Sequence, residues 1–187
     1  MTVTVRQAGP DDAALLHRIA AVTFPLACPP DTTAEAIRQF IHANLGESHF
    51  AAHLADPARE VLVSAVNGVP AGYTMVAHGD PTDADVGAVI TVRPAAELSK
   101  CYVLADFHGA GVAAAQVAEA VRGARARGAA VLWLGVNQHN ARANRFYEKN
   151  GFVRVGTKHF LVGDRFEDDF VRALHLTEHA TSEQAIP

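Results

Sequence analysis

The alternation of apolar and polar positions predicts several β-strands. Residues 2–7 alternate strictly, as expected for a half-buried strand. Residues 60–66 and 70–77 predict two more strands, and the Asn67-Gly68 pair near their junction favours a type I′ hairpin turn. The run at 129–136 is almost continuously apolar, which is typical of a central strand covered on both faces.

About four helices are predicted. Three of them have apolar residues at helical spacing, which gives each one an apolar face: Leu15, Ile19 and Val22; Ile37, Ile41 and Leu45; and Ala114, Val117, Val121 and Ala124. The fourth predicted helix is the segment 140–149. Between the hairpin and the third helix, residues 78–87 are polar and predict a loop. A β segment is expected to reach back past Val92 and to end near Leu104. Two final strands are expected at 152–162 and 166–176.

Composition indicates one folded α/β domain over residues 1–176, followed by a polar and frayed tail at 177–187. Apolar residues make up 49% of the 187 residues, and no apolar run approaches the roughly 20 residues of a membrane span. The net charge of −4 argues against general nucleic-acid binding. Cys28 and Cys101 lie far apart without metal-type spacing, so reduced thiols, a cytoplasmic location and no bound metal are expected.

The strand that ends near Leu104 is followed by a glycine-containing turn, His108-Gly109-Ala110-Gly111-Val112-Ala113, which opens a helix. Gly109 and Gly111 let the backbone curl close to an anion, and the amides at a helix start bind phosphate. The alternative is that both glycines serve only the steric needs of a strand–helix turn.

A second segment of interest follows the apolar strand and contains Asn140, Ala143, Asn144 and Tyr147, spaced i, i+3, i+4 and i+7. On a helix these positions share one face, which presents two amides and a phenol together. A phenol beside a departing thiolate can donate its proton. The alternative is that Tyr147 and Phe146 are paired core aromatics.

The chain resembles the GNAT superfamily of acyl-CoA-dependent N-acetyltransferases in the order and spacing of these segments. The glycine turn is followed by a helix, a strand and the motif Asn140-x-x-Ala143-x-x-Phe146-Tyr147-x-x-x-Gly151-Phe152. The family's motif is Gln/Arg-x-x-Gly-x-Gly/Ala; the chain matches it at Gly111-x-Ala113 but has His108 at the first position. The resemblance implies a mixed, mostly antiparallel central sheet with one splayed parallel strand pair. A looser likeness to the bacterial spermine/spermidine acetyltransferase subgroup rests on short pieces around Phe24, at 51–57 and at 159–169.

The resemblance implies acetyl-CoA as cosubstrate, bound where two parallel strands splay apart at the glycine turn. It assigns the pyrophosphate to the backbone amides of residues 108–113, that is His108, Gly109, Ala110, Gly111, Val112 and Ala113. It places the pantetheine arm along Tyr102, Val103 and Leu104, with the Val103 N–H polarising the thioester carbonyl. From the second segment, Asn140 is the first expected pantetheine contact and Asn144 the second.

The same resemblance makes Tyr147 the general acid for the CoA thiolate, and Glu97 the favoured base for the acceptor amine. A solvent-facing strand residue is an equal interpretation of Glu97. His49 and His159 have suitable chemistry, but the chain has 10 histidines and each is more often structural. Cys101 suggests an acetyl-cysteine, although a small buried thiol is the better interpretation.

The expected acceptor is a primary amine of a small molecule, with a polyamine favoured. The acidic run Glu167-Asp168-Asp169 would attract a polycation, or would equally guard an exposed strand edge with Phe166 and Phe170 facing inward. Two alternatives stay open: an acetyltransferase for protein N-termini or lysines, and a non-catalytic acyl-CoA-binding regulator. A dinucleotide-binding enzyme is disfavoured because no two-half doubly wound pattern surrounds the glycines. Many relatives dimerise through sheet edges, so the resemblance also implies a homodimer.

Overall fold

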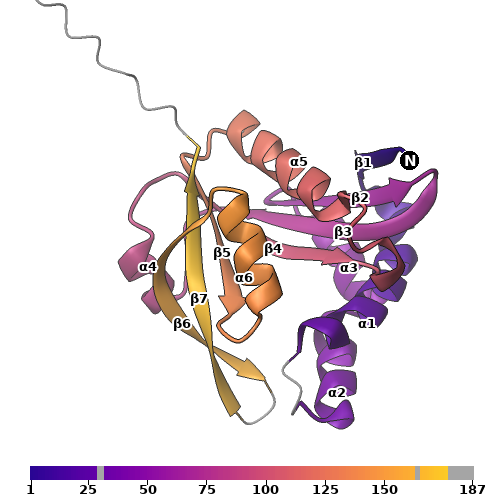
Figure 1. Ribbon diagram of the computed structural model, residues 1–187, viewed down its shortest axis with the longest axis horizontal. Helices are drawn as coiled ribbons and strands as arrows, with labels where there is room; N and C mark the ends of the chain where they lie inside the picture. The colour runs from indigo at the N-terminus through magenta and orange to yellow at the C-terminus, as the bar shows by residue number, and fades with distance from the viewer. Residues whose placement is uncertain (29–31, 163–164, 177–187) are drawn as a thin grey trace, which may run out of the picture.

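A seven-stranded sheet in the order β1-β2-β3-β4-β5-β7-β6 organises the chain (Figure 1). The computed structural model describes residues 1–28, 32–162 and 165–176, without the side chains of residues 160–167, so the expected tail at 177–187 lies outside the described residues. The strands are β1 (Val3–Gln7), β2 (Arg59–Val66), β3 (Val69–His78), β4 (Ala95–Val103), β5 (Val131–Asn137), β6 (Val153–Val162) and β7 (Arg165–His175). All neighbouring strands are antiparallel except the parallel pair β4 and β5, as the sequence predicted.

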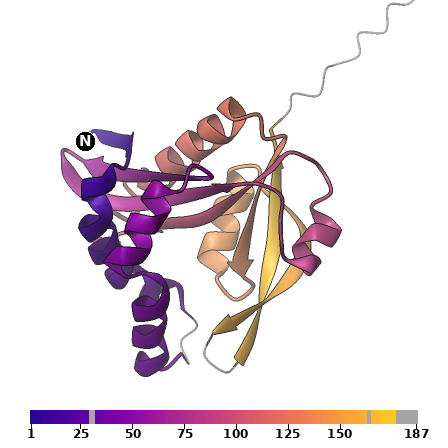
Figure 2. The ribbon, with the colours of Figure 1, turned by 180° about the vertical axis from the view of Figure 1, so that it is seen from behind.

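Helices cover both faces of the sheet. They are α1 (Ala13–Ala27), α2 (Ala34–Asn44), α3 (Glu47–Ala55), α4 (Ala84–Val89), α5 (Val112–Ala126) and α6 (Ala141–Lys149), with short 3₁₀ turns η1 (Pro10–Asp12) and η2 (Ala105–Phe107). Helices α5 and α6 lie on one face, while α1 to α3 lie on the other face, which Figure 2 turns toward the viewer. Helix α4 contacts β6, and its Val86 belongs to a small apolar cluster around Trp133 of β5. None of the helices in the described part of the chain is long and apolar enough to span a membrane.

The predicted hairpin is confirmed, because Asn67 (φ 50°) and Gly68 (φ 82°) both have the positive φ that a type I′ turn requires. The expected polar loop at 78–87 is partly wrong, since α4 begins inside it. Asp83, one of its polar residues, accepts a hydrogen bond from Val86 N and caps that helix (3.0 Å). Helices α3 and α4 therefore add to the four expected.

Strand β4 begins at Ala95, later than expected, because Pro94 has no N–H to donate to a ladder. Its pairing with β5 is confined to Ala95–Glu97 against Val131–Trp133. Beyond Glu97 both strands continue but no longer pair with each other, and their arrows diverge in Figure 1. The strands were expected to separate at the glycine turn, but the gap opens earlier, in the middle of β4. A β-bulge lies at the same place, because Met75 pairs with Lys100 whereas Val76 pairs with Leu98. Bulges bend a strand and increase its twist, which accounts for the early separation.

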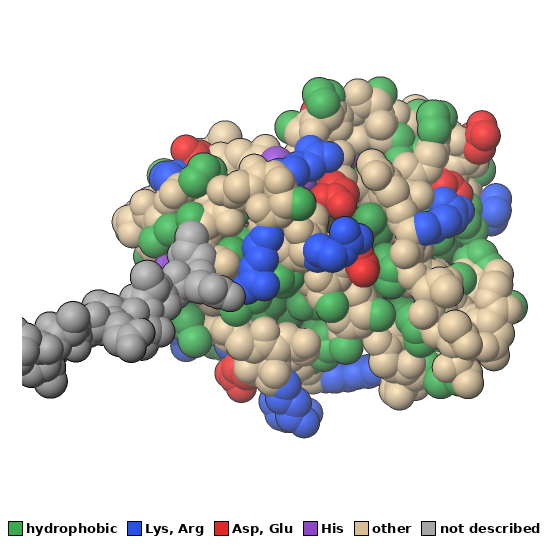
Figure 3. Space-filling view, turned by 90° about the horizontal axis from the view of Figure 1, so that it is seen from above, with side chains coloured by type: hydrophobic (Ala, Val, Ile, Leu, Met, Phe, Trp, Pro, Cys, Tyr) green, Lys and Arg blue, Asp and Glu red, His purple; other side chains and the backbone are tan. Residues whose placement is uncertain are grey.

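Strand β7 lies between β5 and β6; Asp169 pairs with Asn137 of β5, and Gln138 N donates to Asp168 O (3.1 Å). The interpretation as a guarded edge is therefore wrong for Asp168 and Asp169 and stays a prediction for Glu167. The side chains of Phe166 and Glu167 lie outside the described residues. Phe170 is half-buried, with the Arg154 guanidinium 3.7 Å above its ring. Seen from above, the end of the molecule that carries α5 shows basic side chains beside acidic ones (Figure 3), in line with ion pairs such as Glu119–Arg122.

Candidate active site

A cavity of about 290 Å³ opens where β4 and β5 separate. Residues 97–102 of β4 and 135–137 of β5 form its walls, and Tyr147 of α6 closes one side. On the other side Phe24 of α1 and Phe40 of α2 line it, with their rings stacked 4.4 Å apart. The cavity therefore passes through the sheet, from the α6 face to the face that α1 and α2 cover.

The edge of β4 facing this gap offers backbone hydrogen bonds. Leu104 N donates to Ala71 O on the β3 side (2.8 Å). Because N–H groups alternate in direction along a strand, the N–H of Val103 then points to the gap, whereas those of Tyr102 and Leu104 point to β3. The Val103 carbonyl also faces the gap, where it accepts a hydrogen bond from His108. Of the three backbone positions expected to meet pantetheine, only Val103 thus presents its N–H to the gap.

The glycine turn presents four of its six amides. Gly109 and Gly111 have φ of 84° and 80°, and α5 starts directly after Gly111. Among the described residues no acceptor pairs with the N–H groups of Gly109, Gly111, Val112 or Ala113. The remaining two are used inside the turn, where His108 N donates to Ala105 O (3.1 Å) and Ala110 N donates to Phe107 O (3.2 Å). The amides of His108 and Ala110 therefore do not match the expected contact with phosphate.

The His108 side chain joins the two walls of the gap. Its Nδ1 accepts a hydrogen bond from Arg142 of α6 (3.0 Å), because a guanidinium can only donate. Its Nε2 then carries the proton and donates to Val103 O (3.0 Å). A histidine at the first position of the motif thus fixes an arginine beside the amides of the turn.

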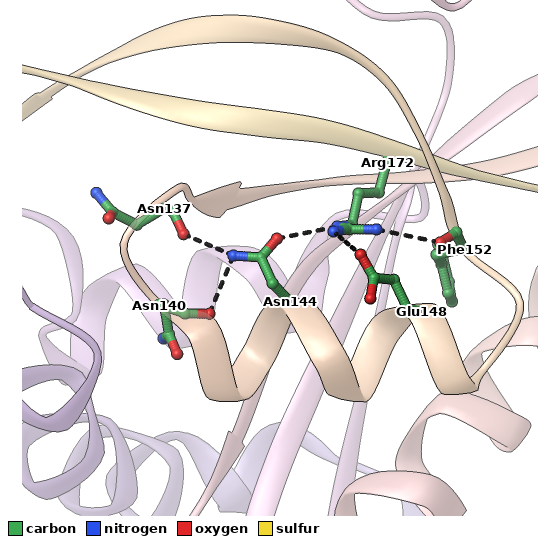
Figure 4. Close-up of polar contacts among 6 residues, drawn as sticks. All are labelled: Asn137, Asn140, Asn144, Glu148, Phe152 and Arg172. Atoms are coloured by element: carbon green, nitrogen blue, oxygen red, sulfur yellow. Dashed lines mark hydrogen bonds and ion pairs between the residues drawn. The ribbon is translucent and has the colours of Figure 1, made fainter.

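The two asparagines of the second segment serve mainly the structure of α6. Asn140 caps the helix by accepting from Ala143 N (3.0 Å). Asn144 is buried and donates to the carbonyls of Asn137 and Asn140 (both 3.0 Å) while accepting from Arg172 Nε (3.0 Å), as Figure 4 shows. Both N–H donors of the Asn144 amide are used, so the expected pantetheine contact is replaced by a structural role.

The same network satisfies the buried guanidinium of Arg172, which also donates to Phe152 O and pairs with Glu148 (2.7 Å). Asn144 and Tyr147 do not point in one direction, because an i, i+3 spacing separates them by about 60° around the helix. Asn144 consequently turns toward β7, and Tyr147 turns toward β4.

Tyr147 lies against Cys101 of β4, and this contact raises the pKa of the phenol further above its usual value, after the larger effect of burial. Burial raises the pKa of the Cys101 thiol to about 12, although hydrogen bonding to Tyr147 lowers it in part. The thiol also points to Gln116 Oε1 (3.4 Å). Such a thiol is not ionised near neutral pH, which supports a structural role for Cys101 and not the acetyl-cysteine.

Glu97 lines the cavity together with Lys100, Lys158 and Asp169. Lys100 pairs with Met75 and Glu97 with Ala77, so the bulge between them places Glu97 and Lys100 on the same face although they are three residues apart. Burial raises the pKa of the Glu97 carboxyl, while Lys158, Lys100 and Arg59 act against this rise. Glu97 is therefore not the solvent-facing strand residue of the alternative interpretation.

Neither candidate histidine lines this cavity. His49 lies in α3, and His159 pairs with Asp168 (2.9 Å) on β6 and β7. Lys100, Lys158 and Arg142 were not among the residues predicted from the sequence for this site. A lysine inside a strand that is otherwise mostly apolar was an available signal for Lys100, but nothing local marked Lys158, which reaches the site through strand pairing with Asp169.

Comparison with known proteins identifies the class. Residues 19–152 match the acetyltransferase (GNAT) family, so the chain belongs to that family. An uncharacterized N-acetyltransferase of Mycobacterium tuberculosis is 44% identical over 165 residues, which cover 88% of this chain and 98% of that protein.

Solved structures of N-acetyltransferases have a similar fold. The crystal structure of PaiA N-acetyltransferase from Thermoplasma acidophilum in complex with coenzyme A matches with a TM-score of 0.74 at 16% identity, over 94% of this chain and 99% of that one. The structure of YncA from Salmonella typhimurium with its cofactor acetyl-CoA matches with a TM-score of 0.63 at 25% identity, over 98% and 99% of the two chains. The chain is an acetyl-CoA-dependent N-acetyltransferase of the GNAT type.

The site fits acetyl-CoA on its own geometry. The turn before α5 presents unpaired amides at a helix start, which suits a pyrophosphate. Strand β4 pairs with β5 only as far as Glu97, and beyond this pair it presents the Val103 N–H to the gap, as pairing with an extended pantetheine chain requires. Residues 97–102 of β4 also line the cavity where Tyr147 and Glu97 lie.

Proposed function

We propose that the enzyme acetylates a primary amine of a small molecule by direct attack within a ternary complex, without an acyl-enzyme. The observation that carries this proposal is that Tyr147 of α6 and Glu97 of β4 line one cavity, where β4 and β5 separate. A proton donor and a proton acceptor thus share the space in which an amine would meet a thioester.

Binding is assigned to backbone groups. The N–H groups of Gly109, Gly111, Val112 and Ala113 hold the pyrophosphate at the positive end of the α5 dipole. Val103 N–H points into the gap and is the donor that would polarise a carbonyl oxygen there. When bound, acetyl-CoA supplies an activated acetyl group.

Proton transfer is assigned to side chains. The acceptor amine arrives as an ammonium without a lone pair, and the Glu97 carboxylate removes a proton from it, directly or through water. Tyr147 donates the proton of its Oη to the departing sulfur. Burial keeps the pKa of that phenol well above its usual value, so the proton is in place throughout the neutral range.

The walls of the cavity favour a small acceptor. The stacked rings of Phe24 and Phe40 limit it on the α1 side, where an acetyltransferase for peptides would need an open groove. The resemblance to the spermine/spermidine subgroup makes a polyamine the first class to assay, although the cavity that holds Glu97 and Asp169 also holds Lys100 and Lys158.

The test is the release of CoA thiol from acetyl-CoA over a panel of polyamines, amino acids, aminoglycosides and N-terminal peptides, with Tyr147→Phe measured alongside. Turnover on small amines is the expected result. Turnover on peptides alone would replace this proposal with a protein acetyltransferase. Acetyl-CoA binding without turnover on any acceptor would favour a non-catalytic acyl-CoA-binding protein.

A further inference from the structure

Basic side chains are as prominent as acidic ones in the cavity. Lys100 of β4 and Lys158 of β6 line it together with Glu97 and Asp169. Arg59 of β2 also acts on both Glu97 and Lys100 electrostatically. An acceptor with several positive charges therefore meets at least as many cations as carboxylates, and gains little net attraction.

The two lysines differ in how they are held. Lys158 on β6 is paired with Asp169 on β7, and both side chains pass close to Gly135 of β5. A Cβ added at Gly135 would lie 2.6 Å from Lys158 Cε and 3.3 Å from Asp169 Oδ2. Glycine at 135 leaves room for both side chains. Trp133 on the same strand lies beneath the Lys158 ammonium, 5.7 Å from it.

Lys100, in contrast, forms no ion pair with any residue that the structure describes. It is half-buried, on a strand face where retaining a charge is costly. Burial lowers the pKa of its ammonium, and Glu97 opposes this change. Glu97 thus acts on Lys100 without forming a close ion pair with it, so the N–H donors of the ammonium can bind an anionic group of a ligand.

The β-bulge sets the relation between this anion site and the base. Because the bulge at Ser99 brings Lys100 onto the face of Glu97, the cavity presents a carboxylate for an amine and an ammonium for an anion from the same strand. The apolar rings of Phe24 and Phe40 lie on the same cavity.

From this arrangement we infer that the acceptor is a zwitterion, a small amino acid whose amine faces Glu97 and whose carboxylate pairs with Lys100. The inference rests on the proposed function and specifies its substrate class. An apolar side chain on the amino acid would pack against Phe24 and Phe40.

Matched acceptors test the inference. Leucine is compared with leucinamide and 3-methylbutylamine, which keep the amine but lose the carboxylate charge, and lysine is compared with cadaverine. We expect kcat/KM to fall by about 10- to 100-fold when the carboxylate is absent, the loss typical of one charged hydrogen bond. Equal or higher kcat/KM for cadaverine and 3-methylbutylamine would overturn the inference while leaving the proposed function intact. Absence of turnover on every acceptor would instead contradict the proposed function.

Variants of Lys100 provide a second test of the inference. Lys100→Met keeps the length of the side chain and is expected to raise KM for leucine by about 10-fold or more, with little change for 3-methylbutylamine. Lys100→Glu is expected to reverse the preference toward cadaverine. Lys149→Met, an exposed lysine of α6, is the control and should change neither constant. An equal effect of Lys100→Met on both acceptors would show a structural role and contradict the inference; circular dichroism establishes that each variant is folded.

Discussion

The phenol of Tyr147 on α6 and the thiol of Cys101 on β4 lie in contact across the gap between β4 and β5, and each alters the pKa of the other. These side chains come from opposite walls of the gap, 46 positions apart in the sequence. Their contact lies where α6 borders the cavity.

Tyr147→Phe removes the proposed acid and keeps the ring that packs on Phe146 and Phe152. We expect kcat to fall by about 10²–10⁴-fold, with KM for acetyl-CoA nearly unchanged. Steady-state kinetics on the best acceptor measures both constants. Because the pKa of the phenol is raised well above 10, the wild-type enzyme should show no loss of activity from ionisation of Tyr147 between pH 7 and 9. Unchanged kcat in the variant would remove Tyr147 from this role.

Cys101→Ala tests the structural interpretation of the thiol. With a pKa of about 12 the thiol is protonated at working pH, so turnover should stay within a few-fold of wild type. The half-buried position predicts a modest loss of stability, about 1 kcal/mol. Intact-protein mass spectrometry after incubation with acetyl-CoA should show no acetyl group on the wild-type enzyme that is missing from the variant. An adduct at Cys101 would revive the covalent mechanism.

Glu97→Gln should abolish the acid limb of the pH profile. The proposed base acts as a carboxylate, so kcat/KM falls as pH decreases through its pKa. Burial raises that pKa above the ordinary value of a glutamate, which moves the midpoint of the fall to higher pH than for an exposed carboxyl. The measurement is kcat/KM against pH for both enzymes, with the acceptor held in one ionisation state. A limb that persists in the variant would assign it to another group.

Gly111→Ala and Gly87→Ala form a matched pair, for which we expect opposite changes in the free energy of unfolding. Neither added Cβ meets an atom within 4 Å, but Gly111 has a φ of 80° whereas Gly87 lies inside α4 without such a φ. The change at Gly111 should cost about 1–2 kcal/mol or turn the adjacent amides, and weaken CoA binding. The change at Gly87 should leave CoA binding alone and add about 0.4–1 kcal/mol of stability. Calorimetric CoA titration and urea unfolding measure the two effects, and equal CoA affinity for both variants would argue against the amide cradle.

Asn144→Ala should affect stability more than catalysis. The change removes the acceptor for Arg172 Nε and the two hydrogen bonds to Asn137 and Asn140, at a cost of about 2–3 kcal/mol. Arg145→Ala, one residue further on an exposed position of α6, should change stability by less than about 0.5 kcal/mol. Urea unfolding measures both. A raised KM for acetyl-CoA with unchanged stability would restore the pantetheine contact expected from the sequence.

Local patterns were sufficient for most strands and for the positions of the motifs. The Asn67-Gly68 turn could be predicted because two residues that tolerate positive φ determine it. The glycine turn and Tyr147 could be placed because the spacing of short motifs is written directly in the chain. Helix α4 was missed because its stabilising contacts, Val86 and Ile90 against Trp133, join segments more than 40 residues apart.

The spacing of two short motifs was enough to predict the family, because it can be read along the chain, and the resemblance then implied the mixed sheet with its parallel pair and the turn for a phosphate. Which side chains share the cavity follows from the three-dimensional packing. The bulge in β4 places Lys100 on the same strand face as Glu97, and strand pairing brings Lys158 and Asp169 to the same cavity. The buried guanidinium of Arg172 donates a hydrogen bond to Asn144. Each of these depends on register and packing between distant strands and helices, which hydrophobic periodicity does not specify.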